Sequence, residues 1–63
     1  MKIGLCGFGV VGRGVYEIVR KRTDMQVSKV LCLEDITFPD ATAVKDFTTI
    51  LEDSEIDTVV EAM

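Results

Sequence analysis

The 63-residue sequence contains no histidine, a single proline and only two cysteines, Cys6 and Cys32. Without histidine, and with its cysteines far apart, the chain shows no cluster of metal ligands, so we expect no metal site. No apolar run reaches the roughly 18 residues of a membrane helix, and no basic segment introduces one as in a secretion signal. These absences argue against a zinc module, a secreted disulfide scaffold and a membrane protein.

The length also limits what the chain can contain. A typical domain has about 100–150 residues, so the chain is at most one small domain or part of one. Its content of 48% hydrophobic and 29% charged residues is typical of a globular chain. A chain of about 60 residues buries only about 60% of its unfolded surface, and it is too short for a two-domain enzyme.

The net charge is −4, and it is unevenly distributed along the chain. Residues 1–29 carry six basic and two acidic side chains, whereas residues 30–63 carry one basic and nine acidic side chains. Nucleic-acid-binding domains usually present a basic patch to the phosphates, so this balance argues against a nucleic-acid partner. Cys6 and Cys32 lie in apolar runs, so we expect them to be small buried hydrophobic residues. The default location for a chain with so few cysteines is a reducing cytoplasm.

The pattern of apolar residues predicts an α/β fold. Short apolar runs typical of buried strands alternate with a segment of helical period, which indicates βαβ units, a parallel sheet and right-handed connections. The predicted elements are a strand at 2–6, a helix at 10–22, a strand at 27–33, a loop at 36–42, an edge strand at 43–47, a short helix capped by Thr48 or Thr49, and a strand at 57–62.

The predicted helix at 10–22 has one apolar stripe, formed by Val11, Val15, Ile18 and Val19, which we expect to face the sheet. The basic residues 20–22 follow it. We interpret them as closing the helix, where cations meet the negative end of the helix dipole. A site for an anion or a partner is the alternative.

A glycine-rich segment joins the first strand to this helix. Its sequence is G-x-G-x-x-G, a pattern typical of dinucleotide-binding loops when it follows a strand and opens a helix. Gly7 permits the tight turn, Gly9 lets a pyrophosphate approach the backbone, and Gly12 lets the helix pack closely on the strand. The alternative is that these glycines serve only the turn and its packing. The candidate cofactor-binding residues here are Gly7, Phe8, Gly9, Val10, Val11 and Gly12.

Two further residues near the loop are less informative. Gly14 adds a fourth glycine to the segment, and we expect it to serve close packing rather than ligand contact. We expect Arg13 to occupy a solvated helix position, with a contact to a phosphate as the alternative.

An acidic residue follows the second predicted strand. Glu34 lies 22 residues after Gly12, with Asp35 beside it. In dinucleotide-binding folds a carboxylate at this place accepts hydrogen bonds from the ribose hydroxyls, and it would repel the additional 2′-phosphate of NADP. Glu34 is therefore the seventh candidate cofactor-binding residue and favours NAD. The alternative is that both acids only end the strand in solvent.

Two segments resemble a known family. Gly-Phe-Gly-Val-Val-Gly-Arg-Gly-Val at 7–15 and Ile-Leu-Glu-Asp-Ser-Glu-Ile-Asp-Thr-Val-Val-Glu-Ala-Met at 50–63 resemble the amino terminus of homoserine dehydrogenase. The resemblance implies that Gly7–Gly12 wrap the pyrophosphate of NAD or NADP. Family members often carry an arginine for the 2′-phosphate of NADP where Glu34 stands here, which again favours NAD.

The resemblance also implies a sheet order and a function. The strand at 57–62 would pair with the strand at 2–6, with the strand at 27–33 on its other side, so that Cys6 and Cys32 lie on neighbouring strands. The parent enzyme would be an oxidoreductase of threonine and methionine biosynthesis, which interconverts aspartate semialdehyde and homoserine by hydride transfer.

The chain would then be the first part of a truncated, Rossmann-like dinucleotide-binding domain covering residues 1–63. Met1 would be its natural start, and the catalytic, substrate-binding and dimerisation residues would lie beyond Met63. We therefore expect no catalytic residue in this chain, no turnover by it alone, and self-association through its uncovered sheet. The alternatives are a stand-alone nucleotide-binding or redox-sensing module, and the first half of another NAD(P)-dependent dehydrogenase.

Overall fold

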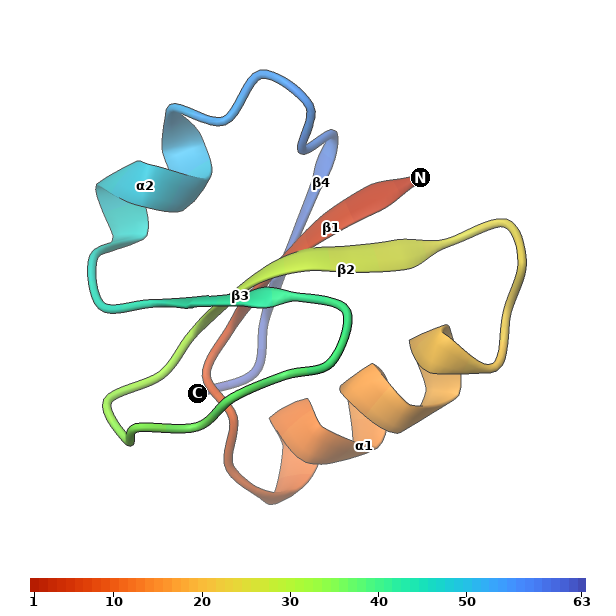
Figure 1. Cartoon of the computed structure of the whole chain (residues 1–63), viewed down its shortest axis with the longest axis horizontal. Coiled ribbons are helices and arrows are strands. Elements are labelled where there is room, and N and C mark those ends of the chain that lie inside the picture. The colour runs from red at the N-terminus through yellow and green to blue at the C-terminus, as the bar shows by residue number, and fades with distance from the viewer.

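The computed structural model describes all residues, Met1–Met63, and is built around a four-stranded sheet with the order β3-β2-β1-β4 (Figure 1). Every neighbouring pair of strands is parallel. The chain is thus a small α/β domain with an all-parallel sheet, which confirms the predicted fold class at this level and is compatible with a Rossmann-like fold. Its elements are β1 (Lys2–Cys6), α1 (Val10–Arg20), β2 (Gln26–Leu31), β3 (Thr42–Val44), α2 (Phe47–Leu51) and β4 (Thr58–Glu61).

Strand β1 lies in the middle of the sheet, between β2 and β4, as the predicted order requires. Its pairing with β2 shifts register, because Ile3 pairs with Val27 whereas Gly4 pairs with Lys29. Ser28 is therefore an extra residue in β2, a bulge that reverses the alternation of faces beyond it. This is why Val27 and Val30, three positions apart, both enter the same buried cluster.

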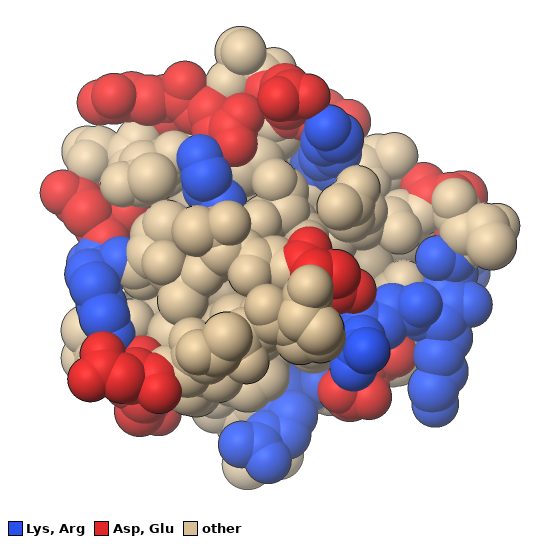
Figure 2. All heavy atoms as spheres, in the orientation of Figure 1, with Lys and Arg blue, Asp and Glu red and all other residues tan.

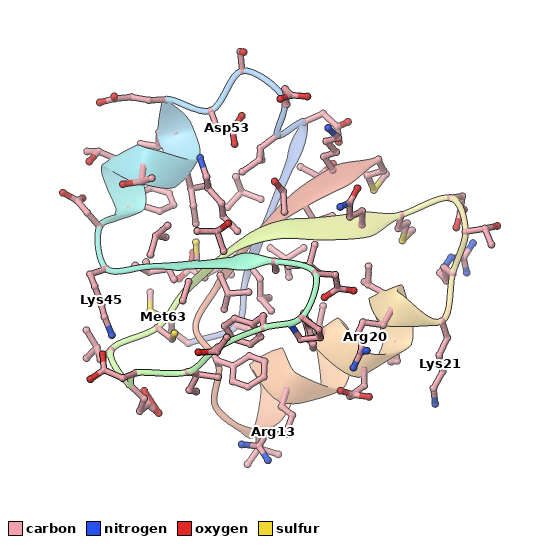
Figure 3. The ribbon with its side chains drawn as sticks, viewed as in Figure 1. Arg13, Arg20, Lys21, Lys45, Asp53 and Met63 are labelled. Atoms are coloured by element: carbon pink, nitrogen blue, oxygen red, sulfur yellow. The ribbon has the colours of Figure 1, made fainter.

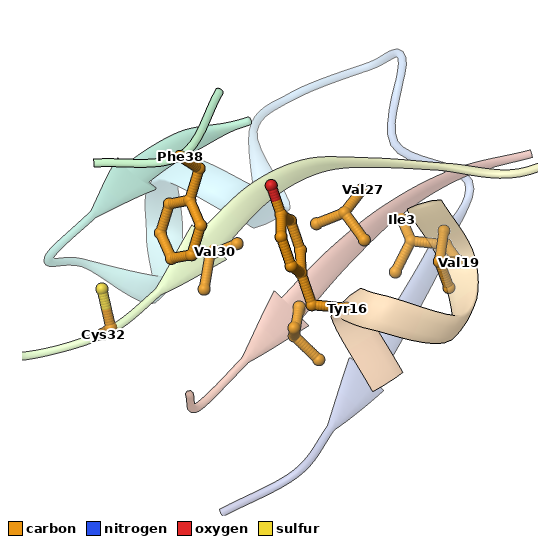
Figure 4. Close-up of a cluster of buried hydrophobic side chains, with 8 residues drawn as sticks. Ile3, Tyr16, Val19, Val27, Val30, Cys32 and Phe38 are labelled. Carbon is orange, nitrogen blue, oxygen red and sulfur yellow. The ribbon is translucent and has the colours of Figure 1, made fainter. Parts of the chain in front are cut away.

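The two faces of the sheet are covered unequally. On one face, α1 and the loop at 32–41 enclose the larger cluster of buried side chains (Figure 4). On the other face, the short helix α2 covers a smaller cluster through Ile50, whose Cγ2 atom lies 2.6 Å from the place that a Cβ on Gly4 would take. The larger cluster consists of Ile3, Leu5, Tyr16, Val19, Val27, Val30, Cys32 and Phe38.

The predicted apolar stripe of α1 is half wrong. Val15 and Val19 do pack towards the sheet, but the side chains of Val11 and Ile18 are each 66% exposed. The buried positions of the helix are instead Gly12, Tyr16 and Val19. The inward face is rotated because Gly12 packs directly on the backbone of Gly7 in the preceding turn, and Tyr16 follows one turn later on the same side.

The bounds of five elements differ from the prediction, and only those of β1 match it. Strand β2 covers Gln26–Leu31 rather than 27–33, and β4 covers Thr58–Glu61 rather than 57–62. Helix α1 ends at Arg20, with Lys21 as its C-cap. Strand β3 covers only Thr42–Val44. Helix α2 begins at Phe47, and its N-cap is Asp46, whose side chain accepts a hydrogen bond from the Thr48 amide, so neither Thr48 nor Thr49 is the cap. This hydrogen bond lowers the pKa of Asp46 below its usual value.

The two cysteines are buried and unpaired, as expected for small hydrophobes. Cys6 ends β1, but Cys32 lies one residue beyond the end of β2, so only Cys6 is on a strand as expected. They belong to different buried clusters, however, with Cys32 on the α1 face and Cys6 on the α2 face.

The charged side chains largely pair with each other at the surface, and acidic groups gather over the α2 side of the molecule (Figure 2). Arg20, in the last turn of α1, lies 3.8 Å from Glu17 and 3.7 Å from Asp40, and Arg22 forms a 2.8 Å pair with Asp24. Arg20 is in the last turn of α1 and Lys21 is its C-cap, so two of the three basic residues do lie at the end of the helix and Arg22 follows it. Neither helix is long and apolar enough to cross a membrane.

Tyr16 fastens the loop at 32–41 to helix α1. Its ring is 3% exposed and meets the ring of Phe38 at a centroid distance of 5.1 Å, while its hydroxyl donates a hydrogen bond to Asp40. Burial and the neighbouring Asp40 carboxylate raise the pKa of Tyr16 to about 12. The loop that leads from β2 to β3 is therefore held against α1 by a neutral phenol.

We expect the stability of the chain to fall at alkaline pH because of this phenol. Tyrosine in the unfolded chain ionises near pH 10, and the folded state resists ionisation up to about pH 12. The contribution is fully present below about pH 10 and is lost as the pH rises through 12. Since the chain has one tyrosine and no tryptophan, ultraviolet absorbance of tyrosinate follows Tyr16 alone.

The variant Tyr16→Phe is the matched control. It should lower the free energy of unfolding by about 1 kcal/mol at neutral pH, the net value of one hydrogen bond. Denaturant unfolding of this variant should show a smaller loss of stability between pH 10 and 12, because only the contributions of Lys2 and Cys6, whose pKa values are also raised, remain. An equal alkaline loss in both proteins would contradict the assignment.

Candidate functional site

The turn from β1 to α1 depends on the backbone of Gly7. Its φ angle is 99°, a left-handed conformation that side-chain-bearing residues rarely adopt. A Cβ here would also lie 2.7 Å from the Cγ of Met63 and 3.1 Å from the carbonyl oxygen of Ala62. The Gly7 amide donates a 2.8 Å hydrogen bond to the carbonyl of Leu31. The loop is thereby joined to the end of β2.

Gly12 brings helix α1 against this turn. A Cβ on Gly12 would overlap the carbonyl oxygen of Gly7 and lie 2.9 Å from its carbonyl carbon. Because those atoms belong to the backbone, they cannot move aside as a flexible side chain would. Gly12 therefore has the close-packing role that the sequence predicts for it.

Gly9 is different because nothing lies within 4 Å of the position that a Cβ would occupy. Gly9 is the N-cap of α1, and no side chain accepts a hydrogen bond from the first turn of the helix, which also contains no acidic residue. The first amides of a helix lack partners within the helix, and its N-terminus carries a partial positive charge. The loop thus leaves open space in front of free donors.

Gly14 and Arg13 differ from the loop glycines. A Cβ on Gly14 would meet nothing within 4 Å, so the expectation of close packing at Gly14 is wrong. Gly14 lies on the exposed outer side of α1, so a larger side chain would fit at this position. Arg13 is exposed, and its guanidinium lies 5.5 Å from the centre of the Phe8 ring.

Phe8 lies under the loop as part of an aromatic cluster. Its ring packs edge-on against Tyr16 at 5.7 Å and against Phe38 at 4.8 Å, measured between ring centroids. The side chain at the second position of the glycine loop therefore anchors the loop to the core of the α1 face. The backbone around it is what a ligand would meet.

Glu34 lies in the turn that follows β2. Its side chain is exposed and forms neither a hydrogen bond nor an ion pair. The backbone of the same residue is held firmly, since its carbonyl accepts hydrogen bonds from the Lys45 ammonium at 2.8 Å and from the Ile36 amide at 3.1 Å. The Glu34 carboxylate is therefore available to a ligand.

One cleft of about 620 Å³ brings these features together at the carboxyl ends of the strands. Ligands of open parallel sheets bind at this edge, and a volume of this order is typical of small-molecule sites. Of the seven candidate residues, six line the cleft, and Gly12 lies behind it against Gly7. The lining consists of Gly7, Phe8, Gly9, Val10, Val11, Leu31, Cys32, Leu33, Glu34, Lys45, Asp46, Phe47, Ala62 and Met63.

Several lining residues were not singled out from the sequence. They come directly after strands β2, β3 and β4, where parallel strands end at a common edge. Knowledge of that edge would have identified Leu33, Lys45 and Met63 once the strands were placed. The rim is also unusually apolar, because Val10, Leu33 and Met63 are 91%, 86% and 86% exposed.

The thiols offer little chemistry. Burial, together with the neighbouring Glu61 carboxylate, raises the pKa of the Cys6 thiol above its usual value, which disfavours the reactive thiolate. Cys32 lines the cleft but is 4% exposed. No group of three or more acidic or cysteine side chains is placed to hold a metal ion.

Comparison of the chain with family models, with curated proteins and with solved structures finds no match. The resemblance to homoserine dehydrogenase therefore depends on the two sequence segments that carry it. The site has to be judged on its geometry.

The glycines of α1 provide a matched pair of substitutions. We expect Gly12→Ala to destabilise the fold by about 1–3 kcal/mol or more, because its methyl group overlaps backbone that cannot yield. Gly14→Ala should stabilise it by up to about 1 kcal/mol, because the position is open and alanine favours a helix. Chemical denaturation measures both changes. Equal effects of the two substitutions would contradict the close approach at Gly12.

Proposed function

We propose that the chain is a Rossmann-like dinucleotide-binding segment that holds NAD or NADP in the cleft at the carboxyl ends of its strands. The observation that carries the proposal is that the glycine loop, the uncapped start of α1 and the free carboxylate of Glu34 line one cleft. Each of these features has a partner in the dinucleotide, and a plain structural turn would need only the first.

The glycine loop suits the pyrophosphate. Gly9 leaves the space that a phosphate would need near the backbone, and the first turn of α1 offers unpaired amides and the positive end of a helix dipole. Backbone amides from 10–12 would donate to the phosphate oxygens. No acidic side chain in that turn would repel them.

The turn after β2 suits the adenosine ribose. A carboxylate accepts hydrogen bonds from both ribose hydroxyls, and it repels a phosphate at the 2′ position. Glu34 is free to do this, because no other group of the chain engages its side chain. The apolar rim of the cleft, including Leu33 and Val10, would pack against the faces of the adenine ring. NAD is therefore the favoured cofactor.

The parent protein that best fits the two sequence segments is homoserine dehydrogenase. The cofactor supplies the hydride that interconverts aspartate semialdehyde and homoserine, and this chain would bind and orient it. Catalytic and substrate residues would belong to the remainder of the enzyme, in a reducing cytoplasm that suits two free thiols. A different NAD(P)-dependent dehydrogenase would use the same cleft, whereas the buried thiols disfavour a redox sensor.

Parallel titrations of the chain with NAD and NADP test the proposal. We expect NAD to bind at least about tenfold more tightly, because hydrogen bonds to a charged group contribute about 1.5–3 kcal/mol and 1.4 kcal/mol corresponds to a factor of ten. Glu34→Gln should remove most of this preference. Tighter binding of NADP by the unaltered chain would contradict the role of Glu34.

Two glycine variants serve as controls for the same titration. Gly9→Ala places a methyl group in the open space before the helix and should abolish binding of both cofactors while the fold persists. Gly14→Ala should leave both affinities unchanged. Binding by Gly9→Ala as tight as that of the unaltered chain would rule out the loop as the pyrophosphate site.

We further propose that the chain associates with itself through the face of the sheet that carries α2. Strand β4 is an edge strand, and Val59 on it is 45% exposed. Val59 borders a hollow of about 270 Å³, shared with Phe47 and Met63. Unpaired edges and apolar patches of this kind favour pairing between chains.

Light scattering tests this association. Val59→Lys should shift the chain towards the monomer at high concentration, because a charge on an edge strand opposes pairing. Ile18→Lys is the matched control on the outer side of α1, where it should have little effect. A concentration-independent monomer for the unaltered chain would contradict the association.

A further inference from the structure

The side chain of Lys45 crosses from the end of β3 to the turn that follows β2 (Figure 3). Its ammonium donates hydrogen bonds of 2.8 Å to the carbonyls of Leu33 and Glu34, and it lies 3.3 Å from a carboxylate oxygen of Asp35. An ammonium has three donors and no acceptor. Two of them bond to carbonyls and the Asp35 carboxylate forms an ion pair with the ammonium, so three consecutive residues of one turn contact Lys45.

Few other contacts hold this turn. The side chain of Leu33 is 86% exposed and that of Asp35 is fully exposed, so neither is packed in place. The loop from 32 to 41 contains no helix or strand, so its backbone carbonyls need donors from outside a strand ladder. Lys45 donates to the carbonyls of Leu33 and Glu34. The Glu34 carbonyl also accepts from the Ile36 amide and the Cys32 thiol.

We infer that Lys45, which also lines the cleft, is a positioning residue for the Glu34 carboxylate and contributes to the preference for NAD over NADP through the turn rather than by binding the cofactor. The inference rests on the proposed function of the cleft. Lys45 acts through the backbone of the turn, which sets where the Glu34 side chain begins. Because Asp35 and two carbonyls already engage the ammonium, its charge is directed at the protein and away from a 2′-phosphate.

The expected effect is local rather than global. The Lys45 side chain is 51% exposed, and exposed ion pairs contribute little to overall stability. Loss of the ammonium should therefore leave the melting temperature nearly unchanged while it loosens the turn. An unchanged melting temperature with a loosened turn would distinguish a positioning role of Lys45 from a contribution to the stability of the whole fold.

The experiment compares Lys45→Met, which keeps the length of the side chain and removes its charge, with Lys21→Met at an exposed lysine that forms no ion pair. Amide hydrogen exchange is measured by NMR without cofactor. The Ile36 amide, bonded to the Glu34 carbonyl, should exchange at least about fivefold faster in Lys45→Met. The Ile56 amide, bonded to the Asp53 carbonyl, is the internal reference and should not change.

The same two variants are titrated with NAD and with NADP. Lys45→Met should weaken NAD about five- to tenfold, and adding Glu34→Gln in that background should change the NAD affinity by less than about twofold. This non-additivity is expected when one residue acts through the other. Lys21→Met should match the unaltered chain in both titrations.

Three results would overturn the inference. One is unchanged exchange of the Ile36 amide in Lys45→Met, and another is full additivity with Glu34→Gln. The third is a larger loss for NADP than for NAD, which would mean that Lys45 binds the 2′-phosphate directly. Failure of the unaltered chain to bind either dinucleotide would instead overturn the proposed function. Faster exchange of the Ile36 amide in Lys45→Met would even then show that Lys45 stabilises the turn.

Discussion

The contact between Gly12 of helix α1 and the carbonyl group of Gly7 governs the arrangement of the α1 face. A single added methyl group would overlap the Gly7 carbonyl oxygen, so the helix lies as close to the turn as two backbones can. This approach sets the rotation of the helix about its axis. Tyr16 and Val19 consequently face the sheet, and Val11 and Ile18 are turned outward. It also directs the uncapped start of the helix towards the ends of the strands.

The second constraint is the set of backbone hydrogen bonds that joins the carboxyl ends of the strands. The Gly7 amide bonds to the Leu31 carbonyl, the Ala62 amide bonds to the Cys6 carbonyl, and the Cys32 amide bonds to the Val44 carbonyl. Each of these bonds continues the hydrogen-bond ladder between two paired strands just past the end of the strands. The cleft is therefore formed by the ends of all four strands, and its shape is tied to the register of the sheet.

Much of the fold could be predicted from the sequence because its signals are local. The buried strand at 2–6, the glycines that follow it and the helix beyond them lie within one continuous segment, and each signal supports the next. The face of α1 could not be predicted, since Val11 and Ile18 match helical spacing as well as Tyr16 does. Apolar residues on two sides of a helix leave its rotation undetermined until a close contact decides it. The bulge at Ser28 was equally invisible, because nothing in a strand of alternating residues marks the one that lacks a partner.

The candidate site divides in the same way. Gly7, Gly9, Gly12 and Glu34 were identified from spacing, because a phosphate loop and the acid after the next strand are patterns in the order of residues. Lys45 was not identified, since its contact with the turn at 33–35 exists only when β2 and β3 lie side by side in one register. The order of amino acids is thus enough to locate the glycines that the backbone of the loop needs, because that need arises between residues close together in the chain. Which side chains share the cleft depends on strand pairing between segments far apart in the chain, and this is settled only when the sheet has formed.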